Sequence, residues 1–232
     1  MNLQDQNILI TGAAEGLGES IASAFAKEKS NLFLLDKNID KLNLNNQNNA
    51  KNCCVDLSNI KELKKMVDLL TKNKIEIDTL IHNASILTPY SFNETSEDYW
   101  DKVNNITLKT AFILSKFVWQ NMIYKKKGVI IFVSSRSGVE GFKDESAYCS
   151  AKHGLEGLMK SLSLEGKEFG IQVFSITPGM FMKTPMSQEN YTDEYKKKWV
   201  DPSLLTPAFI KLASGQLGHL SGKHLDAWKL SK

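Results

Sequence analysis

The segment NILITGAAEGLGES, residues 7–20, decides the fold. An apolar run with the composition of a strand leads directly into Gly12, Gly16 and Gly18, and a helical pattern begins near Leu17. Glycines let the backbone turn sharply and approach a ligand, and the free amides at a helix N-terminus favour an anion. This arrangement predicts a strand, turn and helix that bind a phosphate-bearing ligand. A structural glycine loop without a ligand is the alternative.

Further β-rich apolar runs follow along the chain. They are NLFLLD from residue 31, NCCVD from 52, DTLIHNA from 78, VIIFVSS from 129 and IQVFSITPG from 171. Unbroken apolar runs are typical of parallel strands covered on both faces, and the stretches between them have helical patterns, for example from Thr95 and from Thr206 to Gly215. We therefore expect an α/β fold with a doubly wound parallel sheet, whose ligand site lies beyond the carboxyl ends of the strands.

Length and composition favour one soluble globular domain that spans residues 1–232. The net charge of +3 is too small to indicate nucleic acid as a partner, and no apolar run approaches the length that crosses a bilayer. Three cysteines without metal-ligand spacing, and no signal peptide, predict a cytoplasmic protein without a metal site. The asparagine-rich residues 42–52 are expected to form a helix end and a polar loop before the third strand.

The second predicted strand ends in Asp36, at the position where a carboxylate can accept hydrogen bonds from an adenosine ribose. Asp36 would repel a 2′-phosphate, and the glycine turn carries Glu15 rather than a basic residue. NAD is therefore the predicted cofactor, with NADP less favoured. Lys37 is the alternative signal, because it could turn toward a phosphate.

A second motif, YCSAK at residues 148–152, places Tyr148 and Lys152 about one helical turn apart. On a helix, the phenol and the ammonium project from the same face. An ordinary exposed helix would explain the pentapeptide equally well when it is taken alone.

Together these features resemble the short-chain dehydrogenase/reductase family, in its ordinary single-domain branch, from about residue 5 to 228. The family pattern TGxxxGxG matches residues 11–18, and its YxxxK pair matches Tyr148 and Lys152. The family serine, thirteen positions before the tyrosine, corresponds to Ser135, with Ser134 as the structural alternative. A PG turn follows the sixth predicted strand, as in the family.

The resemblance implies a Rossmann fold and an NAD(P)-dependent oxidoreductase that interconverts a secondary alcohol and a ketone. Tyr148 would exchange the proton, Lys152 would lower the pKa of Tyr148 and hold the nicotinamide ribose, and Ser135 would hold the substrate oxygen. The residues implied in cofactor binding are Gly12, Glu15, Gly16, Leu17, Gly18, Asp36, Asp56, Leu57, Asn83, Tyr148, Lys152, Pro178 and Gly179.

The chain departs from the family in several places. The family NNAG reads HNAS, with His82 and Ser85 in place of asparagine and glycine. Thr107 stands where a catalytic asparagine is expected, and the register of Trp100 argues against Asn104 or Asn105 in that role. A shorter hydroxyl should weaken the proton relay without abolishing the reaction. The PG turn is one residue longer than usual before Thr184, and the tail lacks a glycine pair after its aspartate.

Substrate identity is not predicted beyond an alcohol or ketone. A lid is expected around residues 180–200, where the aromatic residues Phe181, Tyr191, Tyr195 and Trp199 are more simply packing than specificity contacts. A fatty-acyl ketoreductase is a poorer match, because that branch resembles NADP users with a basic glycine turn. Structural roles are expected for Cys149, His82 and His153. A homodimer or homotetramer is the expected assembly, and a dinucleotide-binding scaffold without turnover is the second functional hypothesis.

Overall fold

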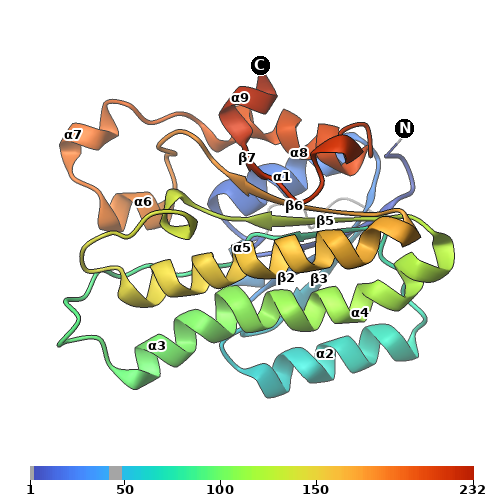
Figure 1. Cartoon of the computed structure of the whole chain (residues 1–232), viewed down its shortest axis with the longest axis horizontal. Coiled ribbons are helices and arrows are strands. Elements are labelled where there is room, and N and C mark those ends of the chain that lie inside the picture. The colour runs from blue at the N-terminus through green and yellow to red at the C-terminus, as the bar shows by residue number, and fades with distance from the viewer. Residues whose placement is uncertain (1–2, 42–48) are drawn as a thin grey trace.

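The computed structural model describes residues 3–41 and 49–232 and contains one seven-stranded sheet (Figure 1). Its strands are β1 (Asn7–Thr11), β2 (Asn31–Asp36), β3 (Ala50–Cys54), β4 (Thr79–His82), β5 (Gly128–Val133), β6 (Ile171–Thr177) and β7 (His224–Asp226). They run parallel in the order β3-β2-β1-β4-β5-β6-β7. The order reverses between β1 and β4, so the predicted doubly wound sheet is confirmed.

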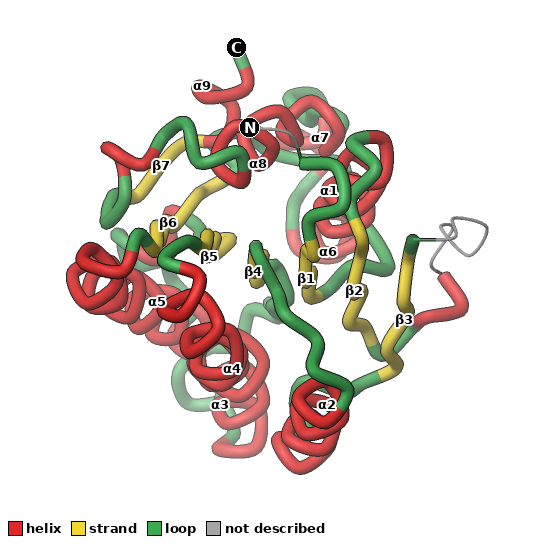
Figure 2. Tube along the Cα trace, turned by 90° about the vertical axis from the view of Figure 1, so that its right-hand side faces the viewer, coloured by secondary structure: helices red, strands yellow, loops and turns green. Residues whose placement is uncertain are grey.

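Helices cover both faces of this sheet (Figure 2). One face carries α1 (Gly16–Lys27), α8 (Thr206–Ala213) and the short α9 (Ala227–Ser231), and the other carries α2 (Ile60–Lys72), α4 (Thr110–Lys125) and α5 (Ser146–Gly166). The remaining α-helices are α3 (Glu97–Asn104), α6 (Pro185–Asn190) and α7 (Asp193–Lys196). Short 3₁₀ turns lie at Ile39–Lys41, Arg136–Gly138, Lys167–Phe169, Pro202–Leu205 and Gly218–Leu220.

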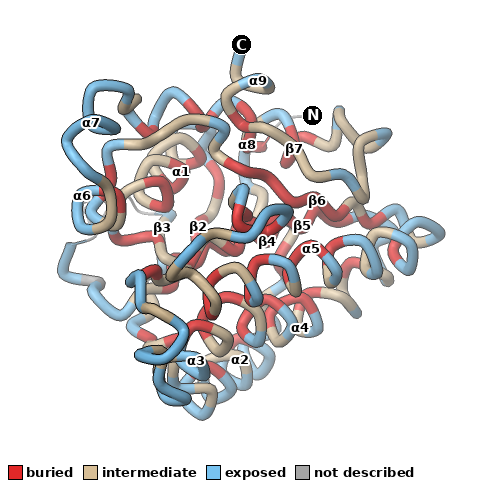
Figure 3. The backbone as a smooth tube through the Cα atoms, turned by 60° about the vertical axis from the view of Figure 1, so that its left-hand side comes forward, coloured by how far each residue is buried: buried red, intermediate tan, exposed pale blue. Residues whose placement is uncertain are grey.

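Alternate side chains of each strand enter one of two apolar cores. Ile8 and Ile10 of β1 join Phe25 and Phe209 beneath α1 and α8, whereas Leu9 joins the core beneath α2, α4 and α5. The strands β1, β2, β4, β5 and β6 and the inner sides of these helices are therefore the buried parts of the described chain (Figure 3). Burial on both faces explains why the strands have unbroken apolar sequences.

Two strands differ from the prediction. β3 begins two residues earlier than the predicted NCCVD run, and residues 42–48 of the asparagine-rich stretch lie outside the described part of the chain. β7 was not predicted at all. It has only three residues, all half-buried, because it pairs with β6 at the edge of the sheet, so its sequence lacks an apolar run.

The helix predicted from Thr95 is interrupted. Ser96 accepts a hydrogen bond from the Tyr99 amide and caps α3, as its sequence indicates. A π-helical turn at Asn105–Lys109 then separates α3 from α4, and Thr110 Oγ1 donates to the Asn105 carbonyl oxygen at 2.8 Å. Such turns inside helices often occur at functional sites.

The segment predicted as a lid contains α6 and α7 beyond one end of the sheet (Figure 1). Its two ends meet through a bridge between Met182 and Val200. The rings of Phe181, Tyr191 and Tyr195 contact one another, as expected for packing residues. Across the described residues, the helices are too short or too polar to cross a bilayer.

Candidate functional site

The glycine turn after β1 is closely packed. Gly12 has a φ of +63°, and a Cβ on Gly18 would lie 1.9 Å from the Gly12 carbonyl oxygen. Asn83 Nδ2 donates to the carbonyl oxygens of Thr11 at 3.2 Å and Gly12 at 3.0 Å, which joins the turn to the end of β4. These contacts require glycine and asparagine at the positions that the sequence indicated.

The start of α1 fits the pyrophosphate of a dinucleotide. Glu15 occupies the N-cap position but makes no side-chain cap, so no carboxylate competes for the first amides of α1. Instead, Glu15 Oε2 lies 3.0 Å from Lys41 Nζ. The base of the lid lies beside this turn, because a Cβ on Gly16 would meet Thr184 Cγ2 at 3.2 Å.

Asp36 lies at the edge of the same turn. Its Oδ2 accepts a hydrogen bond from the Ala14 amide at 3.0 Å, and its Oδ1 accepts one from the Asn38 amide at 2.9 Å. The hydrogen bond to Glu15, its charge, and more weakly the charge of Asp36 raise the pKa of Lys41. Lys41 is therefore a second cation close to the predicted ribose site. The sequence did not reveal it, because a 3₁₀ turn after β2 brings it back toward Glu15.

The remaining residues implied in cofactor binding follow β3 and β6. Asp56 Oδ1 accepts hydrogen bonds from the Ser58 amide and hydroxyl, and Leu57 beside it is buried. The PG turn at Pro178 is held by the tail: Trp228 donates its amide to the Pro178 carbonyl oxygen at 3.2 Å.

Gly179, the second residue of that turn, has a φ of +75°. A Cβ there would lie 2.1 Å from Asp226 Oδ1, so a larger residue would collide with the tail. The tail thus positions the turn although it lacks the familiar glycine pair.

Tyr148 and Lys152 share one face of α5 and are buried, with exposures of 7 % and 2 %. Lys152 Nζ lies 5.4 Å from the centroid of the Tyr148 ring and donates a hydrogen bond to the Val133 carbonyl oxygen at 2.7 Å. The expected convergence of the two side chains is therefore present, and an ordinary exposed helix is excluded at this position.

The expectation that Lys152 lowers the pKa of Tyr148 is not met by the groups of the chain itself. Burial raises the pKa of Tyr148, and hydrogen bonds with Ser85 and Ser135 offset this only in part. Burial also lowers the pKa of Lys152 to about 7. The sequence argument considered the charge of the lysine but not the cost of burying both groups.

Ser135, at the end of β5, faces Tyr148, whereas Ser134 faces Glu156 on α5. Ser135 Oγ accepts a hydrogen bond from the Ser137 amide at 3.2 Å, and Ser137 Oγ donates to Glu145 Oε2 at 3.0 Å. Burial raises the pKa of Glu145, whose charge acts on Tyr148. Neither Glu145 nor the Ser85 contact was predicted, because both depend on how loops after β4 and β5 meet α5.

His82 links the glycine turn to the π-helical turn. Its Nδ1 lies 2.9 Å from Thr11 Oγ1, and its Nε2 lies 2.9 Å from the Thr107 carbonyl oxygen. Burial lowers the pKa of His82 to about 3, so the ring is neutral. A carbonyl only accepts, so Nε2 carries the proton and Nδ1 accepts from the Thr11 hydroxyl.

Thr107 lies in this network through its backbone. Its carbonyl accepts from His82, while its buried hydroxyl has no hydrogen-bond partner among the described residues. The position of the family asparagine thus belongs to the site, but the hydroxyl of Thr107 forms no hydrogen bond with the described residues. A histidine at position 82 and a threonine at position 107 occur together in one connected network.

Neither His153 nor Cys149 joins the site. His153 is exposed, with its Nδ1 2.9 Å from the Cys149 carbonyl oxygen, and the Cys149 thiol is free. No cluster of His, Cys, Asp or Glu suited to a metal ion occurs among residues 3–41 and 49–232.

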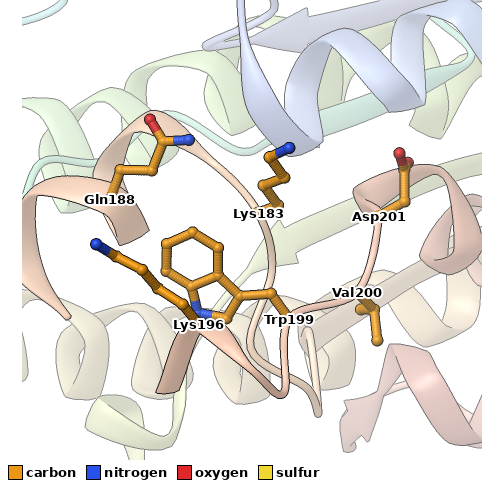
Figure 4. Close-up of a pocket in the computed structure, with 6 residues that line it drawn as sticks. All are labelled: Lys183, Gln188, Lys196, Trp199, Val200 and Asp201. Atoms are coloured by element: carbon orange, nitrogen blue, oxygen red, sulfur yellow. The ribbon is translucent and has the colours of Figure 1, made fainter. Parts of the chain in front are cut away.

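A groove of about 600 Å³ opens in the lid, and the catalytic residues do not line it (Figure 4). Trp199 lies between Lys183 and Lys196, with Gln188 nearby. The ring contacts of the lid join Phe181, Tyr191 and Tyr195, whereas Trp199 lines the groove.

Comparison with known proteins agrees with this geometry. The family model described as short chain dehydrogenase matches residues 6–195. A 3-oxoacyl-[acyl-carrier-protein] reductase FabG of Rickettsia prowazekii (strain Madrid E) is 33 % identical over 189 residues, which cover 82 % of this chain and 78 % of the relative. Sorbitol-6-phosphate 2-dehydrogenase of Klebsiella pneumoniae is 29 % identical, covering 83 % of this chain and 75 % of the relative.

Among solved structures, 4-hydroxyisoleucine dehydrogenase complexed with NADH matches with a TM-score of 0.89 and 26 % identity. The match covers 98 % of this chain and all of the other. The names of these three relatives refer to 3-oxoacyl-[acyl-carrier-protein], sorbitol 6-phosphate and 4-hydroxyisoleucine, so similarity alone does not indicate one substrate for this chain.

Proposed function

This chain belongs to the short-chain dehydrogenase family, and we propose that it interconverts a secondary alcohol and a ketone with NAD as the preferred cofactor. The observation that carries the proposal is the burial of Tyr148 and Lys152 side by side, with Ser135 facing the phenol. A protein that only binds a dinucleotide has no need of this set.

In this proposal, Tyr148 gives a proton to the carbonyl oxygen during reduction and takes one from the alcohol during oxidation. Ser135 holds the same oxygen in place, and Lys152 binds ribose hydroxyls. A bound nicotinamide would supply or accept the hydride. Because the phenol is buried, water is kept from the proton-transfer site.

The glycine turn, the uncapped start of α1 and Asp36 would hold the dinucleotide. The fixed carboxylate of Asp36 supports NAD, since it would accept hydrogen bonds from ribose hydroxyls and repel a 2′-phosphate. Lys37 and Lys41 are the groups that would favour NADP. Lys41 is already paired with Glu15, which weakens its attraction for a phosphate.

A panel of secondary alcohols and ketones, assayed with NAD(H) and NADP(H) by absorbance of the reduced cofactor, tests this function. We expect turnover with members of the panel and a higher kcat/KM for the NAD(H) pair. Failure of every alcohol and ketone with both cofactors, while NADH still binds, would support the dinucleotide-binding scaffold instead.

Asp36→Asn tests the basis of cofactor choice. Removing the carboxylate should lower the ratio of kcat/KM for NAD over NADP about tenfold. This change corresponds to the free energy of roughly one charge-assisted hydrogen bond. Asp40→Asn, an exposed position in the next turn, is the matched control and should leave the ratio unchanged. An unchanged ratio in both variants would show that Asp36 does not select the cofactor.

The proposal includes a homodimer or homotetramer formed through α4 and α5. Large apolar side chains on these helices support it, since Phe112, Tyr124 and Leu164 are all exposed in the single chain.

A further inference from the structure

A second polar cluster lies behind the catalytic residues, between α5 and the strands β6 and β7. Glu156 is 4 % exposed and follows Lys152 by one helical turn. Its Oε2 accepts a hydrogen bond from Ser175 Oγ at 2.6 Å, and its Oε1 lies 2.8 Å from His224 Nδ1. A carboxylate buried this deeply needs such partners, so the cluster is a built feature of the fold.

The cluster adjoins the catalytic residues. A Cβ on Gly138 would meet Ser134 Oγ at 2.7 Å, the Lys152 carbonyl oxygen at 3.2 Å and Glu156 Cγ at 3.3 Å. Only a glycine lets these groups approach so closely. The Lys152 side chain donates a hydrogen bond to the carbonyl oxygen of Val133, the residue before Ser134. Lys152 and the cluster around Glu156 therefore both contact the end of β5.

Few charges face Lys152 in the described part of the chain. Tyr148 and Glu156 come from α5 itself, and His82 comes from β4. His82 is neutral, and Tyr148 is protonated because burial raises its pKa. The anion acting on Lys152 is therefore Glu156, whose charge raises the pKa of Lys152 against the effect of burial.

The partners of Glu156 keep it ionised. Burial by itself would raise the pKa of Glu156, but the hydrogen bonds with His224 and Ser175 and the charge of His224 bring it below its ordinary value. His224 lies on the edge strand β7 with 25 % of its side chain exposed, so it connects the buried carboxylate with the surface.

We propose that Glu156, held by Ser175 and His224, supplies the negative charge that keeps the buried Lys152 as an ammonium ion. Glu156 is a positioning residue, because it acts through Lys152 and does not face the phenol of Tyr148. The importance of this charge for catalysis rests on the proposed function. The charge pairing itself does not, and it is measurable without substrate or cofactor.

A double-mutant cycle of Lys152→Met and Glu156→Gln, followed by urea unfolding at pH 6 and pH 9, tests the pairing. At pH 6 Lys152 is charged, and we expect the two sites to couple by at least tenfold in the unfolding equilibrium constant, about 1.4 kcal/mol. At pH 9 Lys152 is neutral in the native state, and the coupling should fall below twofold. A purely structural Glu156 would couple equally at both pH values, and that result would overturn the proposal.

Two further variants serve as controls for this test. Glu165→Gln changes an exposed carboxylate on the same helix, which accepts a hydrogen bond from Ser161, and should show no coupling to Lys152 at either pH. His224 is the other titratable group facing Glu156, so the cycle is repeated in His224→Gln, where the coupling at pH 6 should persist. If Glu156→Gln does not fold, Glu156→Met, which also removes the charge, replaces it, and the same pH-dependent coupling with Lys152→Met is expected.

Activity separates this inference from the proposed function. If coupling is found but no alcohol or ketone is turned over, the charge pairing stands and the proposed function fails. If turnover is found, Glu156→Gln should move the alkaline limb of the ketone-reduction profile to lower pH by roughly one pH unit. Turnover with no coupling and no shift of that limb would overturn the inference and leave the proposed function intact.

Discussion

At the glycine turn, on the half of the sheet formed by β1 to β4, the hydrogen-bonded polar groups are neutral, whereas two ionisable groups, Lys152 and Glu156, are buried behind β5 and β6. Thr11, His82 and Asn83 form a network of hydrogen bonds without any ion. Lys152 and Glu156 instead place an amine and a carboxyl group in the interior, with His224 beside Glu156.

The difference has a physical consequence. Neutral hydrogen bonds in a close-packed turn depend on shape, so the first half should respond most to added volume and to protonation of His82. Buried charges depend on one another, so the second half should respond to any change that removes a counter-charge. The predictions that follow separate these two responses.

The largest effect expected in the neutral half comes from acid. The pKa of His82 is about 3 in the folded chain and near 6.5 when unfolded, so the unfolded state binds an extra proton between these values. Stability from the neutral ring is complete above pH 6.5 and falls by about 1.4 kcal/mol for each pH unit below it.

Urea unfolding of the wild type and His82→Asn between pH 5 and pH 7 measures this effect. Asn is the family residue at position 82 and does not titrate. The wild type should lose about 2 kcal/mol relative to the variant between pH 6.5 and pH 5, a range that lies above the ordinary pKa values of Asp and Glu. Parallel curves would show that His82 is protonated in the native state or is not buried.

Added volume in the glycine turn should have the next largest effect. Gly18→Ala forces a Cβ against the Gly12 carbonyl oxygen, and we expect a loss of about 1–3 kcal/mol in the free energy of unfolding. Gly157→Ala in α5 is the matched control, because nothing lies within 4 Å of its Cβ position. The control should gain up to about 1 kcal/mol, since alanine favours a helix. Equal effects at both positions would contradict the close packing of the turn.

Thr107 stands between the two halves, and its replacement should have the smallest effect. Its hydroxyl has no partner among the described residues, whereas its carbonyl is held by His82 whatever the side chain. Thr107→Asn should therefore leave turnover unchanged or raise it, as measured by kcat with the best substrate of the panel. A clear fall in kcat would show that threonine is adapted to this site.

The sequence predicts the neutral half well and the charged half poorly. Gly12, Gly16 and Gly18 are local signals, because strand, turn and helix follow one another directly in the chain. Asp36 and Asn83 stand at the ends of two other strands, where the motif places them. The prediction that Tyr148 and Lys152 lie on one face of a helix is also confirmed, because both residues belong to α5.

The remaining features depend on long-range packing. Glu156 meets Ser175 and His224 only after β6 and β7 align, and β7 itself has no apolar run. The pKa of Tyr148, which the groups of the chain itself raise, departs from the sequence expectation for a related reason. Burial decides that the pKa of Tyr148 rises. That burial depends on the lid and the loops around α5 rather than on the pentapeptide.

Turnover and NADH binding measured side by side in the wild type and Tyr148→Phe test the central claim most directly. With Ser135 and Lys152 unchanged, we predict that kcat falls about 10²- to 10⁴-fold, the usual contribution of a general acid or base, while the Kd for NADH stays within about twofold. Tyr124→Phe, at an exposed position in α4, should change neither value. Retention of wild-type turnover in Tyr148→Phe would contradict the assignment of Tyr148 as the proton donor and acceptor.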